Sequence, residues 1–196
     1  MPRRPTRTVP TVLLHGRGGI DPDGWQSWLA GELTATGREV RYPQLPGVPD
    51  PTLDEWLSAL RTTLDGLPDD GFDVVGHSLG ALLWLHHAMN PAGSPRPARV
   101  ALVSLPAPAR VQAVASTFAP VPLDIDAIRK AADGTVLVGG DDDPACPGGV
   151  ARVYGAPLKM AATMIGCAGH LTPESGYAQF PAMLDWCGRD NLAFIA

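Results

Sequence analysis

A serine between two glycines is the residue of this chain best placed to do covalent chemistry. It lies in Gly76-His77-Ser78-Leu79-Gly80, after an apolar run at 72–75 and before a helix-length run at 79–90. A serine at the apex of a sharp strand-to-helix turn is exposed above a sheet, and side chains at the two glycine positions would collide with the neighbouring strand and helix. The alternative is a serine that only caps the helix N-terminus. The pattern favours Ser78 as a nucleophile.

A serine hydroxyl becomes a good nucleophile only when a neighbouring base takes its proton, so a histidine is required. Of the five histidines, His170 follows the last apolar run in the small-residue segment Gly-Cys-Ala-Gly-His. A base that reaches the serine turn must lie in such a loop, at the carboxyl end of a strand. His77 belongs to the turn itself, where we expect its side chain to point away from that of the serine. The sequence therefore predicts His170 as the base.

An acid that orients the base is expected among Asp141, Asp142 and Asp143, which follow the apolar run at 135–138. Only one of them can orient a histidine, and the other two would then be solvated turn residues. A cation site is disfavoured, because consecutive side chains diverge while hard-cation loops space their ligands around the ion. The chain order serine, aspartate, histidine is characteristic of α/β-hydrolases.

Backbone N–H groups that could bind an oxyanion are expected at Leu79 and at Arg17, in the loop His15-Gly16-Arg17-Gly18-Gly19. The same loop could instead begin a dinucleotide-binding motif. In that motif the third glycine position would fall on Asp21, whose charge would repel a pyrophosphate. The loop therefore favours an oxyanion hole, and no organic cofactor is expected.

The elements that must position these residues alternate along the chain. Apolar runs at 11–14, 39–42, 72–75, 100–105, 135–138 and 159–165 predict six strands, with helices at 24–36, 53–67, 79–90 and 177–187. This rhythm predicts an α/β fold with a mostly parallel sheet covered on both faces. The segment 106–133 is long for a crossover, and is either a substrate flap or an irregular connection.

Composition narrows the class of protein. The chain has 196 residues, 45% hydrophobic content and a net charge of −5, which together predict one globular domain over 9–196 after a short basic tail at 1–8, and no nucleic-acid partner. The three cysteines have no Cys-x-x-Cys spacing, so no zinc ribbon is expected and a reducing compartment is favoured. No apolar run approaches 18 residues, so we expect no membrane span and a cytoplasmic location.

The chain resembles the small serine hydrolases grouped around retinoblastoma-binding protein 9 and the bacterial YdeN-type proteins. The resemblance rests on the serine turn and on four further motifs: Val-Leu-Leu-His-Gly at 12–16, Gly-Trp-Gln-Ser-Trp at 24–28, Leu-Asp-Glu-Trp at 53–56, and Asp-Asp-Pro at 142–144 with Gly-His at 169–170. It implies a compact α/β-hydrolase fold with a six-stranded, mostly parallel sheet, helices on both faces and no large cap domain. It also implies Ser78 as nucleophile, Asp143 as acid and His170 as base, without metal or cofactor.

We therefore expect a hydrolase that cleaves small carboxylic esters, with thioesters or amides as alternatives, through an acyl-enzyme. The alternative from another class is a non-catalytic binding protein on a hydrolase scaffold, because fold alone does not give function. A chain of this length leaves little sequence for a cap, so we expect a shallow site. Trp25, Phe118 and Val121 are the expected substrate-binding residues, from the loop at 17–28 and the segment 106–133. Val114 and Leu123 of that segment could complete one apolar wall.

Overall fold

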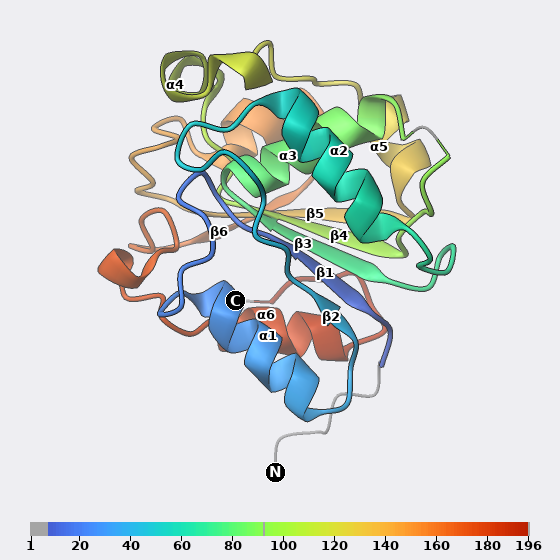
Figure 1. Cartoon of the computed structure of the whole chain (residues 1–196). Helices are drawn as coiled ribbons and strands as arrows, with labels where there is room; N and C mark the ends of the chain where they lie inside the picture. The colour runs from blue at the N-terminus through green and yellow to red at the C-terminus, as the bar shows by residue number, and fades with distance from the viewer. Residues whose placement is uncertain (1–7, 92, 196) are drawn as a thin grey trace.

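Six short segments form one parallel sheet with the strand order β2-β1-β3-β4-β5-β6 (Figure 1). The computed structural model describes residues 8–91 and 93–195. The strands are β1 (Thr11–Leu14), β2 (Val40–Arg41), β3 (Asp73–His77), β4 (Arg99–Val103), β5 (Gly134–Gly140) and β6 (Ala162–Ile165). Every neighbouring pair is parallel. The predicted α/β class and the six-stranded sheet are confirmed, although β2 is shorter than expected.

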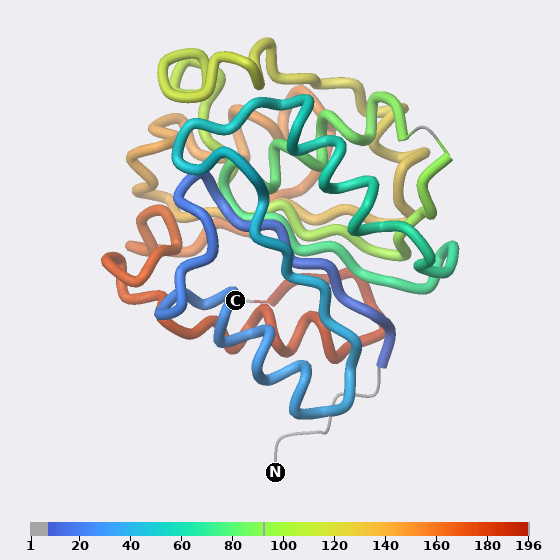
Figure 2. The backbone as a smooth tube through the Cα atoms, viewed as in Figure 1, coloured from blue at the N-terminus to red at the C-terminus, as the bar shows by residue number. Residues whose placement is uncertain are grey.

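The central strands are apolar along their length because helices cover both faces of the sheet. On one face lie α1 (Trp25–Ala35) and α6 (Pro181–Gly188); the other carries α2 (Leu53–Leu64), α3 (Leu79–Met89) and α5 (Ile125–Ala131) (Figures 1 and 2). The buried side chains accordingly form two clusters, one on each side of the sheet. Single-turn helices η1 (Ser116–Phe118), η2 (Ala151–Gly155) and η3 (Pro173–Ser175) lie in the connections.

The last helix is shorter than the sequence indicated. It begins at Pro181 rather than near residue 177, with Phe180 in a non-helical conformation as its N-cap. Proline is preorganised for the first helical position, and the residue before a proline is disfavoured in helical conformation. The start of α6 is therefore set by Pro181, which the apolar pattern alone does not reveal.

The segment 106–133 is an ordered crossover that also reaches the carboxyl ends of the strands. It forms α4 (Pro108–Val114), η1 and α5, and α5 packs against α3. The start of α4 is held to the loop after β5, because the N–H of Ala107 donates to the carbonyl of Ala145 at 2.9 Å. The segment is thus an irregular connection in which α5 packs on α3, and Val111 and Val114 of α4 line the same cavity as Ser78.

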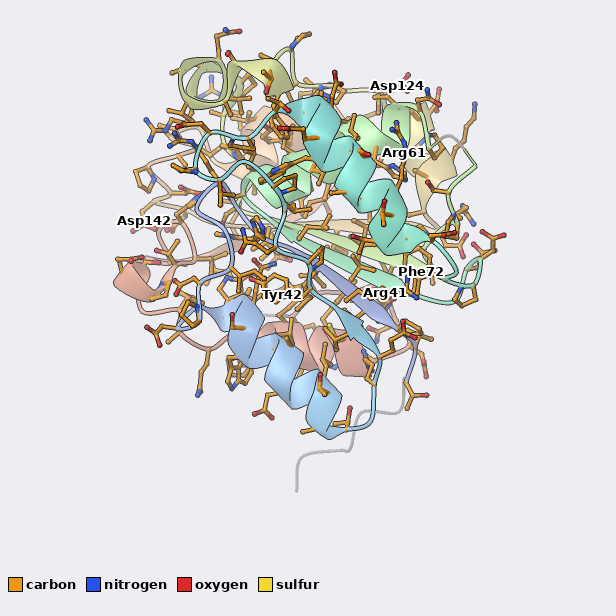
Figure 3. The ribbon with its side chains drawn as sticks, in the orientation of Figure 1. Arg41, Tyr42, Arg61, Phe72, Asp124 and Asp142 are labelled. Atoms are coloured by element: carbon orange, nitrogen blue, oxygen red, sulfur yellow. The ribbon has the colours of Figure 1, made fainter. Side chains whose placement is uncertain are left out.

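The two ends of the sheet carry different residues. Figure 3 shows Phe72, which precedes β3, and Asp142, which follows β5, at opposite ends. At the amino-terminal end the buried Arg99 pairs with Asp73 and donates to the carbonyls of Trp186 and Arg189, which ties α6 to β3 and β4. The residues with candidate chemistry all follow the carboxyl ends, where open α/β sheets bind ligands.

No helix within residues 8–91 and 93–195 combines the length and the apolar character that crossing a membrane requires. The predicted basic tail at 1–8 lies, except for its last residue, outside the described part of the chain.

Candidate active site

Ser78 lies at a strained turn between β3 and α3. Its φ is 53° and its ψ is −119°, a backbone conformation that side chains rarely adopt. A Cβ added at Gly76 would lie 2.7 Å from Cα of Ala81, and one added at Gly80 would lie against the carbonyl of His15. Both glycines are thus required by the close approach of helix and strand, which confirms the collision argument made from the sequence.

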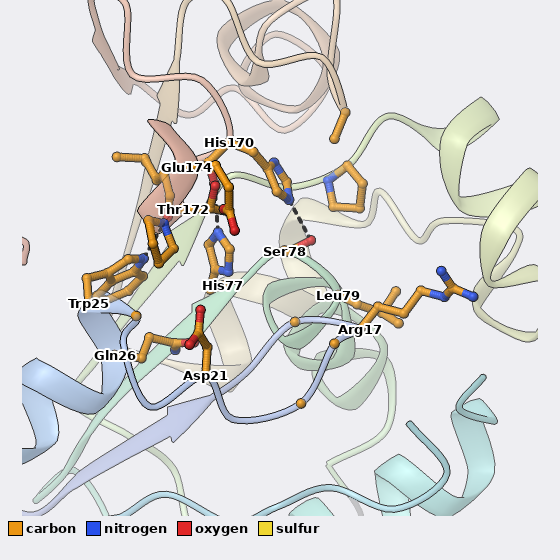
Figure 4. Close-up of a pocket in the computed structure, with 18 of the residues that line it drawn as sticks. Arg17, Asp21, Trp25, Gln26, His77, Ser78, Leu79, His170, Thr172 and Glu174 are labelled. Carbon is orange, nitrogen blue, oxygen red and sulfur yellow. Dashed lines mark hydrogen bonds between the residues drawn. The ribbon is translucent and has the colours of Figure 1, made fainter. Parts of the chain in front are cut away.

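A line of hydrogen bonds joins Asp143, His170 and Ser78 (Figure 4). Asp143 Oδ2 accepts from His170 Nδ1 at 2.8 Å, and His170 Nε2 lies 2.9 Å from Ser78 Oγ. Asp143 is 2% exposed, and its Oδ1 also accepts the backbone N–H of Ala145 at 2.8 Å. The imidazole is therefore held with its proton on Nδ1 and with Nε2 free to accept the serine proton.

The other two aspartates contact the loop that carries His170. Asp141 Oδ1 accepts the N–H of Cys167 at 2.9 Å, and Asp142 Oδ1 accepts that of Gly169 at 2.7 Å. Both are exposed, yet neither is an idle turn residue. Of the three carboxylates it is the one of Asp143, adjacent to Pro144, that contacts the imidazole.

Arg17 and Leu79 both border the cavity above Ser78. Leu79 is the first residue of α3, so its N–H has no acceptor within the helix. Among the hydrogen bonds of the described residues, none uses the backbone N–H of Arg17 or of Leu79. The Arg17 side chain points away from Ser78 and pairs with the exposed Asp50, at 2.6 Å. What Arg17 offers the site is thus its backbone.

The cavity at Ser78 has a volume of about 600 Å³ and two different walls. One wall is apolar and comes from α4 and the residue after it, with Val111, Val114 and Ala115. The opposite wall is polar, with Asp21 from the loop before α1 and Thr172 and Glu174 from η3 and its N-cap. These three polar residues were not among the expected substrate-binding residues, although Asp21 lies in the loop at 17–28 from which contacts were expected.

The three residues expected to bind substrate are placed differently. Trp25 lines the cavity, but it is 2% exposed and its indole N–H donates to the carbonyl of Leu171 at 2.9 Å. Phe118 is fully buried with its ring 5.4 Å from that of Trp56, and Val121 packs against the same cluster. Phe118, Val121 and Leu123 do not line the cavity, whereas the expected Val114 does, together with Val111 of the same helix α4.

The histidines around the site are kept neutral. Burial, together with the nearby His170, lowers the pKa of His77 to about 4. Burial also lowers the pKa of His15, whose Nδ1–H donates to the carbonyl of Gly16 and whose Nε2 accepts the N–H of Leu45. Burial near Asp143 raises the pKa of Cys146 to about 11, so that thiol is not a competing nucleophile near neutral pH.

Within the described part of the chain, no three or more His, Cys, Asp or Glu side chains are grouped to hold a metal ion. The acidic run at 141–143 instead directs its oxygens at backbone N–H groups and at an imidazole.

Comparison with known proteins places these residues in a family. The model of the family described as serine hydrolase matches residues 11–188. YdeN of Bacillus subtilis (strain 168) is 22% identical over 183 residues, a match that covers 91% of this chain and 94% of YdeN. The predicted resemblance to YdeN-type serine hydrolases is thereby confirmed.

Solved structures agree in fold. The structure of YdeN has a TM-score of 0.77 at 22% identity, with 91% of this chain and 96% of that chain covered. A YdeN-like protein from Pectobacterium atrosepticum has a TM-score of 0.71 at 21% identity, covering 91% and 88%. An extracellular α/β-hydrolase from a Paenibacillus species has a TM-score of 0.62 at 17% identity, covering 93% and 100%. The compact α/β-hydrolase fold is therefore confirmed.

Proposed function

Because this chain belongs to the serine hydrolase family, we propose that it hydrolyses small carboxylic esters through Ser78, His170 and Asp143. The observation that carries the proposal is the unbroken line of hydrogen bonds from Asp143 Oδ2 through the imidazole to Ser78 Oγ. This geometry suits acyl transfer, because the base lies within reach of the proton that it must take.

The reaction has two halves. Ser78 Oγ attacks the acyl carbon while its proton passes to His170 Nε2, and the carboxylate of Asp143 offsets the charge of the imidazolium. The N–H groups of Arg17 and Leu79 stabilise the oxyanion. His170 then gives its proton to the leaving alkoxide, which departs as the alcohol. In the second half His170 takes a proton from water as the water oxygen attacks the acyl carbon. His170 Nε2 then returns that proton to Ser78 Oγ as the acyl–oxygen bond breaks, which releases the acid and restores the free enzyme.

The cavity favours short acyl groups. Its one apolar wall comes from α4 and is the length of a two-turn helix. Each extra methylene contributes about 0.8 kcal/mol only while apolar wall remains to cover it. The value of kcat/KM is therefore proposed to rise over the first few acyl carbons and then to level off. A cytoplasmic location is part of the proposal, supported by the three free cysteines.

A panel of p-nitrophenyl esters of graded chain length and a fluorophosphonate probe test the proposal. The wild-type protein is expected to hydrolyse the short esters and to be labelled rapidly at Ser78. Ser78→Ala should abolish both reactions and leave the thermal midpoint nearly unchanged, because the change leaves no cavity and keeps the Cβ at this position. Wild-type turnover by Ser78→Ala would refute the proposal. A wild-type protein that neither hydrolyses nor labels would favour the non-catalytic alternative.

A further inference from the structure

The loop that carries the base cannot hold its shape by backbone preferences alone. In the base loop, defined as residues 167–171, Cys167, Gly169 and Leu171 all have φ near +50°. Two of these three are not glycine, so each adopts a conformation that side chains disfavour. Such strain persists only where surrounding groups hold the backbone in place.

Side chains from other segments supply that support at both ends of the base loop. Asp141 and Asp142 accept the N–H groups of Cys167 and Gly169, and Trp25 Nε1 donates to the carbonyl of Leu171. These bonds hold the residues on either side of His170. None of them involves the backbone of the base itself.

His77 makes the bond to the base residue. Its Nε2 lies 2.9 Å from the carbonyl oxygen of His170, and because a carbonyl only accepts, this nitrogen must carry the proton (Figure 4). His77 immediately precedes Ser78 at the end of β3, so one short segment carries the nucleophile and also holds the backbone of the base. The ring is held in turn between Trp25, at 5.7 Å between centroids, and the imidazole of His170, at 5.1 Å.

The ring of His77 suits this role because it stays uncharged. Burial and the proximity of His170 lower its pKa to about 4, so the ring is neutral near pH 7. A cation at this place would repel the imidazolium that forms on His170 during the reaction. A neutral N–H donor supplies the hydrogen bond without that repulsion.

We propose that His77 is a positioning residue, which holds the His170 carbonyl so that the imidazole Nε2 stays within reach of Ser78 Oγ. The proposal rests on the ester hydrolysis proposed above. A misplacement of about 1 Å at reacting atoms can cost about 10²-fold in rate. Loss of the bond should therefore lower kcat by about that factor and leave KM nearly unchanged, because His77 acts through the base.

Two replacements of His77 by side chains of similar size distinguish the effect of its hydrogen bond from the effect of its packing. His77→Gln keeps an N–H donor near the place of the imidazole Nε2, whereas His77→Met fills comparable space without a donor. We expect His77→Gln to lose only a few-fold in kcat and in the rate of fluorophosphonate labelling, and His77→Met to lose about 100-fold in both. Should His77→Met not fold, His77→Asn replaces it, because its shorter amide does not reach the His170 carbonyl.

His86 provides the matched control. Its Nε2–H donates to the carbonyl of Phe118, also at 2.9 Å, but away from the base loop. His86→Met should lower the thermal midpoint as a lost hydrogen bond does, without the 100-fold loss of kcat. Equal kcat for His77→Gln and His77→Met, or a raised KM with unchanged kcat, would overturn the proposal. If the wild-type protein itself neither turns over esters nor labels, the proposed function fails, which is a distinguishable result.

Discussion

At the scale of single residues, three consecutive carboxylates reach three different donors. Asp143 accepts from the imidazole of His170, while Asp141 and Asp142 accept from the backbone of the base loop. Their positions differ in burial as well, since Asp143 is 2% exposed and the other two are exposed. Three adjacent aspartates thus have different partners because the chain turns between them, which points their side chains in different directions.

Asparagine substitutions distinguish these roles. Asp143→Asn should lower kcat by roughly 10⁴-fold, because a carboxamide can donate to Nδ1 and so favour the wrong imidazole tautomer. Asp141→Asn and Asp142→Asn keep an oxygen for the same backbone N–H groups and should lose less than about tenfold. The measurement is kcat on a short ester, with the thermal midpoint as a check of folding. An equal loss for Asp142→Asn would show that Asp142 is the orienting acid.

The local sequence was sufficient to identify single candidate catalytic residues, but not the hydrogen bonds that hold them in place. Ser78 and His170 could be nominated because a strained turn and a small-residue loop each leave a recognisable pattern. The bonds that hold the base loop join residues up to 146 positions apart, such as Trp25 and Leu171. No local pattern encodes such a bond, so the sequence predicted neither the bond of Trp25 to the Leu171 carbonyl nor that of His77 to the His170 carbonyl.

At the scale of elements, the apolar wall of the cavity shows that an apolar sequence pattern does not reveal which neighbour a buried side chain contacts. Of the apolar residues of the segment 106–133 that were expected to face the site, Val114 lines the cavity, whereas the ring of Phe118 contacts those of Trp56 and His86. An apolar pattern says that a side chain is buried, but not against which neighbour. The wall comes from α4 because its start is held to the loop after Asp143.

Two valine truncations test which element contacts the acyl chain. Val114→Ala removes apolar surface from the cavity wall, and Val121→Ala removes the same atoms outside the cavity. Since about 0.8 kcal/mol per methylene corresponds to roughly fourfold, Val114→Ala should change the hexanoate to butyrate ratio of kcat/KM several-fold. Val121→Ala should leave that ratio unchanged. If Val121→Ala changed the ratio and Val114→Ala did not, the acyl chain would contact the segment after η1 and not α4.

At the scale of the whole molecule, buried neutral histidines couple stability to pH. Burial, and the charge of Arg61, lower the pKa of His87 to about 4, and its buried Nδ1 has no hydrogen-bond partner among the described residues. Its ring packs against Trp84, 5.0 Å between centroids. The pKa of His77 is also lowered to about 4, so protonation of this ring likewise disfavours the folded state. The fold therefore favours the uncharged form of both rings.

The sign of the pH dependence follows from this preference. The unfolded chain takes up a proton at each ring near pH 6.5, whereas the folded chain does so only near pH 4. The stability that neutral His87 contributes is thus fully present above pH 6.5 and is lost as the pH falls towards 4. Each such group contributes a slope of up to about 1.4 kcal/mol per pH unit within this window.

Urea unfolding between pH 7 and pH 4.5 measures this slope in variants of His87. His87→Leu and His87→Gln differ in packing and polarity, so their absolute stabilities should differ, but neither side chain titrates. In both variants the unfolding free energy should therefore fall less steeply below pH 6.5, by an amount that corresponds to nearly one proton. At pH 4.5 His87→Leu should be stabilised most relative to the wild type, because it also removes an unpaired buried nitrogen. A wild-type slope retained in both variants would show that His87 does not cause it, against the expectation that burial and the charge of Arg61 disfavour the protonated ring.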